Sequence, residues 1–197
     1  KMDEGSASRT IEVQVDKNAA LYYYPQPVIP FAQSAFDSKM TIHLEDETSK
    51  LFLLEIISCG RNAHEERFQY RRFSSKVLLY RGEKLIYRDN TRYEPGKMPM
   101  EGIGLYEGFT HMANLFLSKL CDRGDADGLD RTSELKEKIW QILDEDSEVD
   151  GGVTRLTTGD LALRIFGHRA QKLQQIAEKI KEIYTSCQIN HKSVMNE

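Results

Sequence analysis

The chain has 197 residues, of which 40% are hydrophobic, and a net charge of −4 at neutral pH. This size is enough for one sizeable core, and the acidic balance argues against a general nucleic-acid-binding protein, which needs an excess of Lys and Arg to neutralise phosphates. Cys59, Cys121 and Cys187 are widely spaced and odd in number, so neither a disulfide framework nor a zinc knuckle is indicated.

Neither a membrane span nor a signal peptide is visible in the sequence. No stretch approaches the ~18 consecutive apolar residues that a spanning helix needs. We therefore expect a cytoplasmic protein without a membrane partner. The chain begins at Lys1 and enters a predicted strand near Thr10, which suggests that its numbering starts inside a longer gene product and that an N-terminal region is missing.

The first part of the chain is dominated by alternating apolar and polar residues, the pattern of half-buried strands. Residues 10–15 and 40–44 alternate in this way, and a further strand begins at residues 21–24 after an Asp-Lys-Asn turn. The run 51–57 is apolar almost throughout, which suits a strand that is buried on both faces. This part of the chain is therefore predicted to be β-structure.

Two more strands are expected on either side of the Arg-Gly-Glu-Lys hairpin loop, at residues 77–80 and 85–87. The segment "MANLFLS" also alternates and favours a strand, although a short helix competes. Residues 151–167 have glycines at each end and alternating apolar residues between them, which predicts a hairpin that returns to the sheet.

Helices are predicted only late in the chain. "SELKEKIWQILDE" has helical apolar spacing, with Thr132 or Ser133 as the expected N-cap, and residues 169–184 form an amphipathic stripe. We expect a single β-rich domain over residues 1–187 and a polar tail over residues 188–197.

Residues 55–72, "EIISCGRNAHEERFQYRR", raise the question of a metal site. Cys59, His64 and one of the nearby glutamates could bind a borderline divalent ion. The Cys-x4-His spacing is not a recurrent metal pattern, however, and the flanking arginines would repel a cation. A catalytic pair, with Cys59 as nucleophile and His64 as base, lacks a visible orienting group and oxyanion hole.

A structural role for the same stretch is physically sufficient. Gly60 permits a bend after the buried strand, and Arg61 is expected to reach a carboxylate and fix the turn. This is the favoured interpretation from the residues alone.

Two other segments carry polar or aromatic clusters. The loop "CDRGDADGLDRT" resembles a calcium loop only in composition, because its fifth and sixth positions from Asp125 do not fit, and it is expected to be solvated. "YYYPQPVIPF" is typical of an edge strand that leaves the sheet, since proline cannot donate to a ladder. Stiff segments rich in aromatic residues also commonly serve as anchors in protein interfaces.

Two ordered motifs resemble the urease accessory protein D family, called H in some bacteria. "LYYYPQPVIPFAQSAF" resembles the family's Pro-Gln-x-x-Ile-x-Phe segment, and "EIISCGRNAHEERF" resembles its Glu-Ile-x-x-x-Gly-Arg-x-x-x-x-Glu-x-Phe segment. Later strands are similar as well, so the resemblance covers essentially the whole chain. The matching positions are Pro25, Gln26, Ile29, Phe31, Glu55, Ile56, Gly60, Arg61, Glu66 and Phe68.

The resemblance implies a mainly β fold, with stacked strands forming a β-helix-like or sandwich-like scaffold and two α-helices towards the C-terminus. It also implies a non-catalytic scaffold that bridges a helical urease accessory protein, an accessory GTPase (through the complex) and apo-urease for nickel insertion, with no resident cofactor and nickel at most in transit. Partner-binding or nickel-route residues are then expected at Tyr24, Pro25, Gln26, Phe31, Glu55, Cys59, Gly60, Arg61, His64 and Glu66.

The sequence departs from the family pattern in two places. The family's N-terminal region, which ends in a Thr- and Gln-rich strand, is absent here. The family also often has a glycine where this chain has Glu65, which leaves the local backbone geometry open.

Two alternatives come from other classes of protein. A metal-dependent enzyme on a cupin-like scaffold would use His43, His64, His111 and Glu55, which would have to converge on one ion. A β-rich adhesion or carbohydrate module is disfavoured because disulfides and a secretion signal are lacking.

Overall fold

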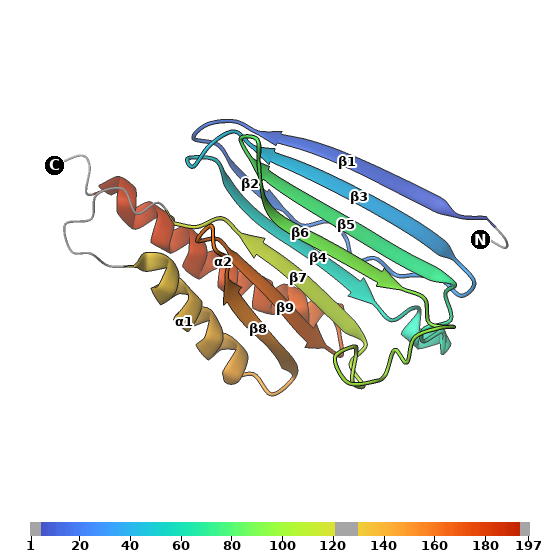
Figure 1. Ribbon diagram of the computed structural model, residues 1–197. Helices are drawn as coiled ribbons and strands as arrows, with labels where there is room; N and C mark the ends of the chain where they lie inside the picture. Colours follow the sequence, from blue (N-terminus) through green and yellow to red (C-terminus); the bar gives the residue numbers. More distant parts are fainter. Residues whose placement is uncertain (1–4, 121–129, 194–197) are drawn as a thin grey trace.

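Two β-sheets and two helices form three layers in the computed structural model, which describes residues 5–120 and 130–193 (Figure 1). The first layer, named here the open sheet, has the strand order β1-β3-β5-β6, with β1 (Ala7–Val15), β3 (Ala35–Leu44), β5 (Arg72–Arg81) and β6 (Lys84–Tyr93). The second, the covered sheet, has the order β2-β4-β7-β9-β8, with β2 (Ala20–Tyr23), β4 (Lys50–Ser58), β7 (His111–Leu117), β9 (Leu161–Gly167) and β8 (Val149–Arg155). The helices α1 (Arg131–Asp144) and α2 (Ala170–Ser193) pack on the covered sheet.

The first five strands alternate between the two sheets as the chain winds forward. β1, β3 and β5 pair in parallel in the open sheet, and β2 pairs in parallel with β4 in the covered sheet. Each crossover between parallel neighbours therefore contains a strand of the opposite sheet, as in a β-helix. From β6 onwards the strands pair antiparallel, including β4 with β7 and β8 with β9. The predicted mainly β scaffold with stacked strands and two late helices is confirmed.

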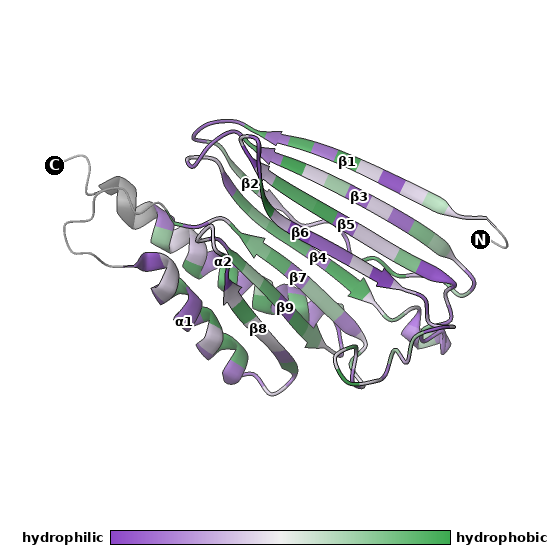
Figure 2. Cartoon of the chain, viewed as in Figure 1, coloured by the Kyte–Doolittle hydropathy of each residue, from purple (hydrophilic) through white to green (hydrophobic). Residues whose placement is uncertain are grey.

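β4 lies at the centre of the molecule because both of its faces are apolar. Figure 2 shows hydrophilic and hydrophobic residues alternating along the strands of the open sheet, whereas β4 is mostly hydrophobic. Leu51 and Leu53 pack between the sheets, and Phe52 and Leu54 pack under the helices. Each such side chain stabilises the fold by about 1.5–3 kcal/mol when it is fully buried. The prediction that residues 51–57 are buried on both faces is confirmed.

Several local predictions can be compared with the structure. "MANLFLS" belongs to strand β7, and residues 151–167 contribute to the β8–β9 hairpin, as predicted. The N-cap of α1 is Asp130 and not Thr132 or Ser133, because the Asp130 carboxylate accepts a hydrogen bond from the Ser133 N–H at 3.1 Å.

The predicted tail and the predicted aspartate loop compare differently with the structure. Helix α2 continues past its predicted end at Tyr184 to Ser193, into residues predicted as a tail. Most of the predicted aspartate loop, together with Cys121, falls within residues 121–129, outside the described residues, as do residues 194–197 of the predicted tail. Neither helix in the described ranges is both long and apolar enough to cross a membrane.

Candidate functional site

The two ends of the sandwich differ in the length of their connections (Figure 1). At one end, named here the loop end, residues 24–34, 59–71 and 94–110 form long loops. At the opposite end, the turn end, short connections join the strands, as at residues 45–49 and 82–83. Most of the site residues predicted from the sequence lie in the loop end.

A sharp bend follows β4 at Gly60, whose φ is +135°. A Cβ atom at this position would lie 2.0 Å from the Glu66 carbonyl oxygen, so only glycine fits. The Phe68 N–H then donates to the Cys59 carbonyl at 2.7 Å and closes the loop. Glu65 has a φ of 59°, the left-handed conformation that glycine favours. The backbone geometry left open by the sequence at Glu65 is therefore one that a glycine would adopt readily.

Arg61 and Glu66 brace this bend, as predicted for Arg61. The guanidinium donates through Nε to Glu66 Oε2 at 2.8 Å and through Nη2 to Oε1, a two-pronged pair. Glu66 Oε2 also accepts the Ala32 N–H at 3.1 Å, so the pair joins two loops. The hydrogen bonds from Arg61 lower the pKa of Glu66 to about 2. The Arg61 guanidinium lies 4.6 Å from the centre of the Phe31 ring and holds that ring in place.

Large apolar side chains are exposed on these braced loops. Phe31 is 51% exposed, Ile29 50% and Ile103 97%. An exposed apolar side chain is ordinary when isolated, but several on the loops of one end of a rigid frame are typical of an interaction site. The loop end therefore combines a braced backbone with exposed apolar side chains.

Arg67 provides a second brace that the sequence did not reveal. Its Nη2 donates to Glu101 Oε2 at 2.7 Å and to the carbonyls of Gly108 and Phe109 at 2.9 and 3.0 Å. These bonds tie the 59–71 loop to the 94–110 loop. No local pattern indicates such a partner, because Arg67 and Glu101 are far apart in the sequence.

The first residues of the 24–34 segment pack beside the helical layer. The Tyr24 ring packs 5.5 Å from the Phe52 ring, and Lys181 Nζ lies 5.3 Å from its centre, so Tyr24 joins β4 to α2. Pro25 is half-buried beside it and Gln26 is exposed. This part of the aromatic segment is therefore directed towards the helical layer and not towards Phe31.

The residues proposed for a metal site do not come together. Cys59 is fully buried among aromatic and Met side chains, and burial raises the pKa of its thiol, which disfavours the thiolate. His64 is exposed on a short 3-10 helix, Asn62–His64. Within the described residues, no group of three or more His, Cys, Asp and Glu side chains could hold a metal ion. The cysteine and histidine that a closed Cys-His-Glu site would need therefore lie apart, one buried and the other exposed.

The histidines of the cupin-like alternative are also dispersed. His43 lies on the outer face of the open sheet, with its ring 5.0 Å from that of Tyr80, as its position in the alternation predicted. His111 begins β7, and its Nδ1 lies 2.8 Å from Thr110 Oγ1. Glu55 lies between the sheets. The convergence on one ion that this alternative requires is not found.

Glu55 belongs instead to a polar layer across the interior, named here the polar belt. Polar residues of adjacent strands in the open sheet lie side by side and point into the interior. A row of polar residues in the covered sheet faces them. The belt consists of Arg9, Ser38, Ser75, Asp89 and Thr91 in the open sheet and Glu55, Asn114 and Arg164 in the covered sheet. It separates two apolar clusters between the sheets, one towards each end of the molecule.

Two contacts of the belt cross from sheet to sheet. Arg9 Nη2 lies 3.9 Å from Glu55 Oε1, and Arg164 Nη2 donates to Asp89 Oδ1 at 3.2 Å. Arg164 also donates through Nε to Asn114 Oδ1 at 2.9 Å. Arg9 and Arg164 are partly exposed, so the belt reaches the surface on both sides.

Burial raises the pKa of the Glu55 carboxyl, an effect that Arg9 opposes and Asp89 reinforces. A cavity of about 10 Å³, lined by Glu55, Asp89 and Asn114 among others, lies beside it. Such a volume is about that of one water molecule. The interior therefore offers two carboxylates and a small space that they line together with apolar side chains. The sign of the polar belt that the sequence offers is Asn114, a polar residue within a mostly apolar strand.

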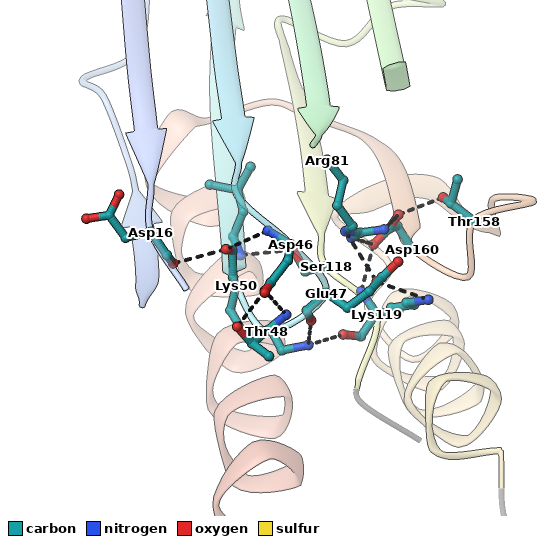
Figure 3. Close-up of polar contacts among 12 residues, drawn as sticks. Asp16, Asp46, Glu47, Thr48, Lys50, Arg81, Ser118, Lys119, Thr158 and Asp160 are labelled. Atoms are coloured by element: carbon teal, nitrogen blue, oxygen red, sulfur yellow. Dashed lines mark hydrogen bonds and ion pairs between the residues drawn. The ribbon is translucent and has the colours of Figure 1, made fainter. Parts of the chain in front are cut away.

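The turn end is closed by a polar network (Figure 3). Asp160 is fully buried and accepts from Arg81 Nη2 at 2.6 Å, from Thr158 Oγ1 at 2.6 Å and from the Lys119 N–H at 2.9 Å. Arg81 comes from the open sheet, and Asp160 precedes β9 of the covered sheet. This pair joins the two sheets at the turn end.

The chain is similar to urease accessory proteins over nearly its whole length. A family profile described as UreD urease accessory protein matches residues 1–196. The urease accessory protein UreH of Helicobacter pylori (strain J99) is 32% identical over 183 residues, which cover 93% of this chain and 64% of that protein. UreD of Acetivibrio thermocellus is 31% identical over 185 residues, and UreD of Haemophilus influenzae (strain PittGG) is 29% identical over 194 residues, covering 66% and 68% of those proteins. The chain thus spans just under two thirds of the length of the Helicobacter relative.

Proposed function

Because the chain belongs to the UreD family of urease accessory proteins, we propose that it acts in urease maturation as a non-catalytic scaffold. In this role it bridges a helical accessory protein, an accessory GTPase held through the complex, and apo-urease, so that nickel is inserted into the urease active site. Nickel is the cargo of this process and not a resident cofactor.

The observation that carries the scaffold role is the loop end. Phe31 is half-exposed, yet its ring is fixed by Arg61, which is itself fixed by Glu66. A preorganised aromatic side chain loses little conformational freedom on binding, which is why such residues are common interface anchors. Ile29 and Ile103 provide further apolar area on the same end.

The polar belt supports a route for nickel through the scaffold. Ligand exchange along a route requires weak binding at each step, and a carboxylate that is partly neutralised by neighbouring cations binds weakly. Glu55 beside Arg9 and Asp89 beside Arg164 meet this description. Cys59, His64 and Glu66 were also expected on such a route, but Cys59 is enclosed by apolar side chains and Glu66 is engaged by Arg61. Glu55 is therefore the better candidate.

Co-purification with the helical accessory protein, the GTPase and apo-urease tests the scaffold role. Phe31→Ser should reduce recovery of the assembly at least about tenfold, because a lost anchor typically costs more than about 1.4 kcal/mol of binding. Leu85→Ser is the matched control, since Leu85 is 44% exposed on the β5–β6 hairpin at the turn end, and it should bind normally. Equal binding by both variants and the parent chain would remove the loop end from the interface.

The same assay separates docking from nickel transfer. Glu55→Gln keeps the size and hydrogen bonding of the side chain but removes its charge. We expect normal co-purification and a lower nickel content in the urease. Glu12→Gln, on the exposed outer face of the open sheet, is the control for the lost charge. Normal nickel content with Glu55→Gln would exclude the belt as a route.

A further inference from the structure

The outer face of the open sheet carries two lysines side by side. Lys39 of β3 and Lys76 of β5 are register partners in a parallel pair. Both side chains point away from the interior, because Ser38, Met40 and Val77 beside them are buried. Neighbouring strands lie about 4.8 Å apart, so the two ammonium groups share one small area of surface.

Arg88 of β6 extends this cluster to a third strand. Lys76 is the register partner of Asn90, and Arg88 lies two residues from Asn90 on the same exposed face. Leu78, the register partner of Arg88, is half-exposed beside Lys76 and Arg88. Lys39, Lys76 and Arg88, named here the cationic ladder, therefore lie next to an apolar side chain.

Most cations of the described chain have carboxylate partners, whereas the three ladder cations, like Lys84, Lys138 and Lys179, form no ion pair. Each of the following cations forms an ion pair with a carboxylate: Arg61, Arg67, Arg72, Arg81, Arg92, Arg155, Arg164, Arg169, Lys172 and Lys181. Within the described residues, no carboxylate lies within 4.0 Å of a ladder cation.

Acidic groups on the same face do not neutralise the ladder. Asp37 is paired with Arg72, and Glu94 with Arg92 and Lys97. Glu12 of β1 is diagonal to Lys39 without forming an ion pair, since its register partner is Thr41. Like charges on directly opposed strand positions destabilise a sheet. The ladder thus carries a local cost in a protein whose net charge is −4.

We propose that the cationic ladder of Lys39, Lys76 and Arg88 is a docking surface for a carboxylate-rich segment of a protein partner. Opposite charges on the partner would relieve the repulsion and fix its orientation. Three cations on an acidic molecule are few for nucleic acid, which requires many phosphate contacts, while Leu78 beside Lys76 and Arg88 provides the apolar contact typical of protein interfaces. The partner is taken to be a member of the urease maturation assembly, so this inference rests on the proposed function.

The test is the affinity of the chain for the accessory proteins and apo-urease, measured at low and high salt. Lys39→Glu places an acid opposite Lys76, which should leave the melting temperature unchanged or raise it. It should nevertheless raise the Kd by about tenfold at low salt and flatten the salt dependence. Lys76→Glu should behave in the same way. The control is Lys138→Glu, an exposed lysine of α1, which should bind like the parent chain.

The outcomes separate the two proposals. If the parent chain binds the assembly and Lys39→Glu binds as tightly as Lys138→Glu, the ladder is not a docking surface and the scaffold role stands. If the parent chain binds none of these proteins, both proposals fail. A short DNA duplex and vesicles containing anionic phospholipid serve as further probes. Binding to either that Lys39→Glu abolishes, without an effect on protein binding, would overturn the assignment to an acidic protein segment.

Discussion

The turn end and the loop end close the same sandwich by different means. At the turn end, short connections and the buried Arg81–Asp160 pair join the two sheets. At the loop end, Arg61 and Arg67 brace long loops through ion pairs that remain partly exposed, and apolar side chains stay on the surface. The comparison shows that polar bracing can serve two purposes. Buried pairs hold sheets together, whereas partly exposed pairs hold in shape the surface that we propose for binding.

The largest effect is expected at the turn end. Asp160→Ala leaves the Arg81 guanidinium, which is only 7% exposed, without its main partner. Removing one member of a buried pair typically costs about 3–5 kcal/mol of unfolding free energy. Chemical denaturation measures this loss. Glu47→Ala is the control, because Glu47 is half-exposed where it contacts Arg81 and Lys119, and its loss should cost less than about 1 kcal/mol. Comparable losses for both variants would contradict the distinction.

A backbone substitution probes the loop end. Gly60→Ala imposes a side chain at a φ of +135° and against the Glu66 carbonyl, so we expect a loss of about 3 kcal/mol. Gly104→Ala also has a positive φ, +78°, but no neighbouring atom lies within 4 Å, and a loss of about 1 kcal/mol is expected. Thermal melting of both variants measures the difference. If Gly60→Ala costs no more than Gly104→Ala, the bend is not rigid and the proposed preorganisation fails.

The smallest effect concerns pH. Because the pKa of Glu66 is lowered from 4.5 to about 2, its contribution to folding is complete above about pH 4.5 and is lost as the pH falls through about 2. Amide hydrogen exchange in residues 59–71 should therefore accelerate on acidification through this window, relative to the rate expected for free amides. Glu66→Gln should exchange faster at neutral pH and show no such window. An identical pH profile in that variant would assign the acid response to another group.

The sequence predicted features that depend on neighbouring residues. Alternation located the strands, the apolar run 51–57 indicated burial on both faces, and Gly60 with Arg61 indicated a braced bend. These signals are local, because a pleat or a positive φ is decided within a few residues.

Features that depend on distant partners were not predicted. The parallel pairing of β1 with β3 joins residues separated by a whole intervening strand. The contact of Arg9 with Glu55 and the pair of Arg67 with Glu101 require the same knowledge of register. Since many acids could have served each arginine, only the folded topology selects the partner. The separation of Cys59 from His64 has the same origin, because the bend at Gly60 leaves the first inside and the second outside.

The alternation of β1 to β5 between the two sheets also has a kinetic consequence. No two consecutive strands among β1 to β5 pair with each other, so every pairing among these strands closes a loop that contains a further strand. Domains dominated by such distant contacts fold slowly. During synthesis, each new coil would complete its ladder on the preceding one, and the nascent chain would expose the unpaired edges of β4 and β5 until β7 and β6 have emerged and paired with them.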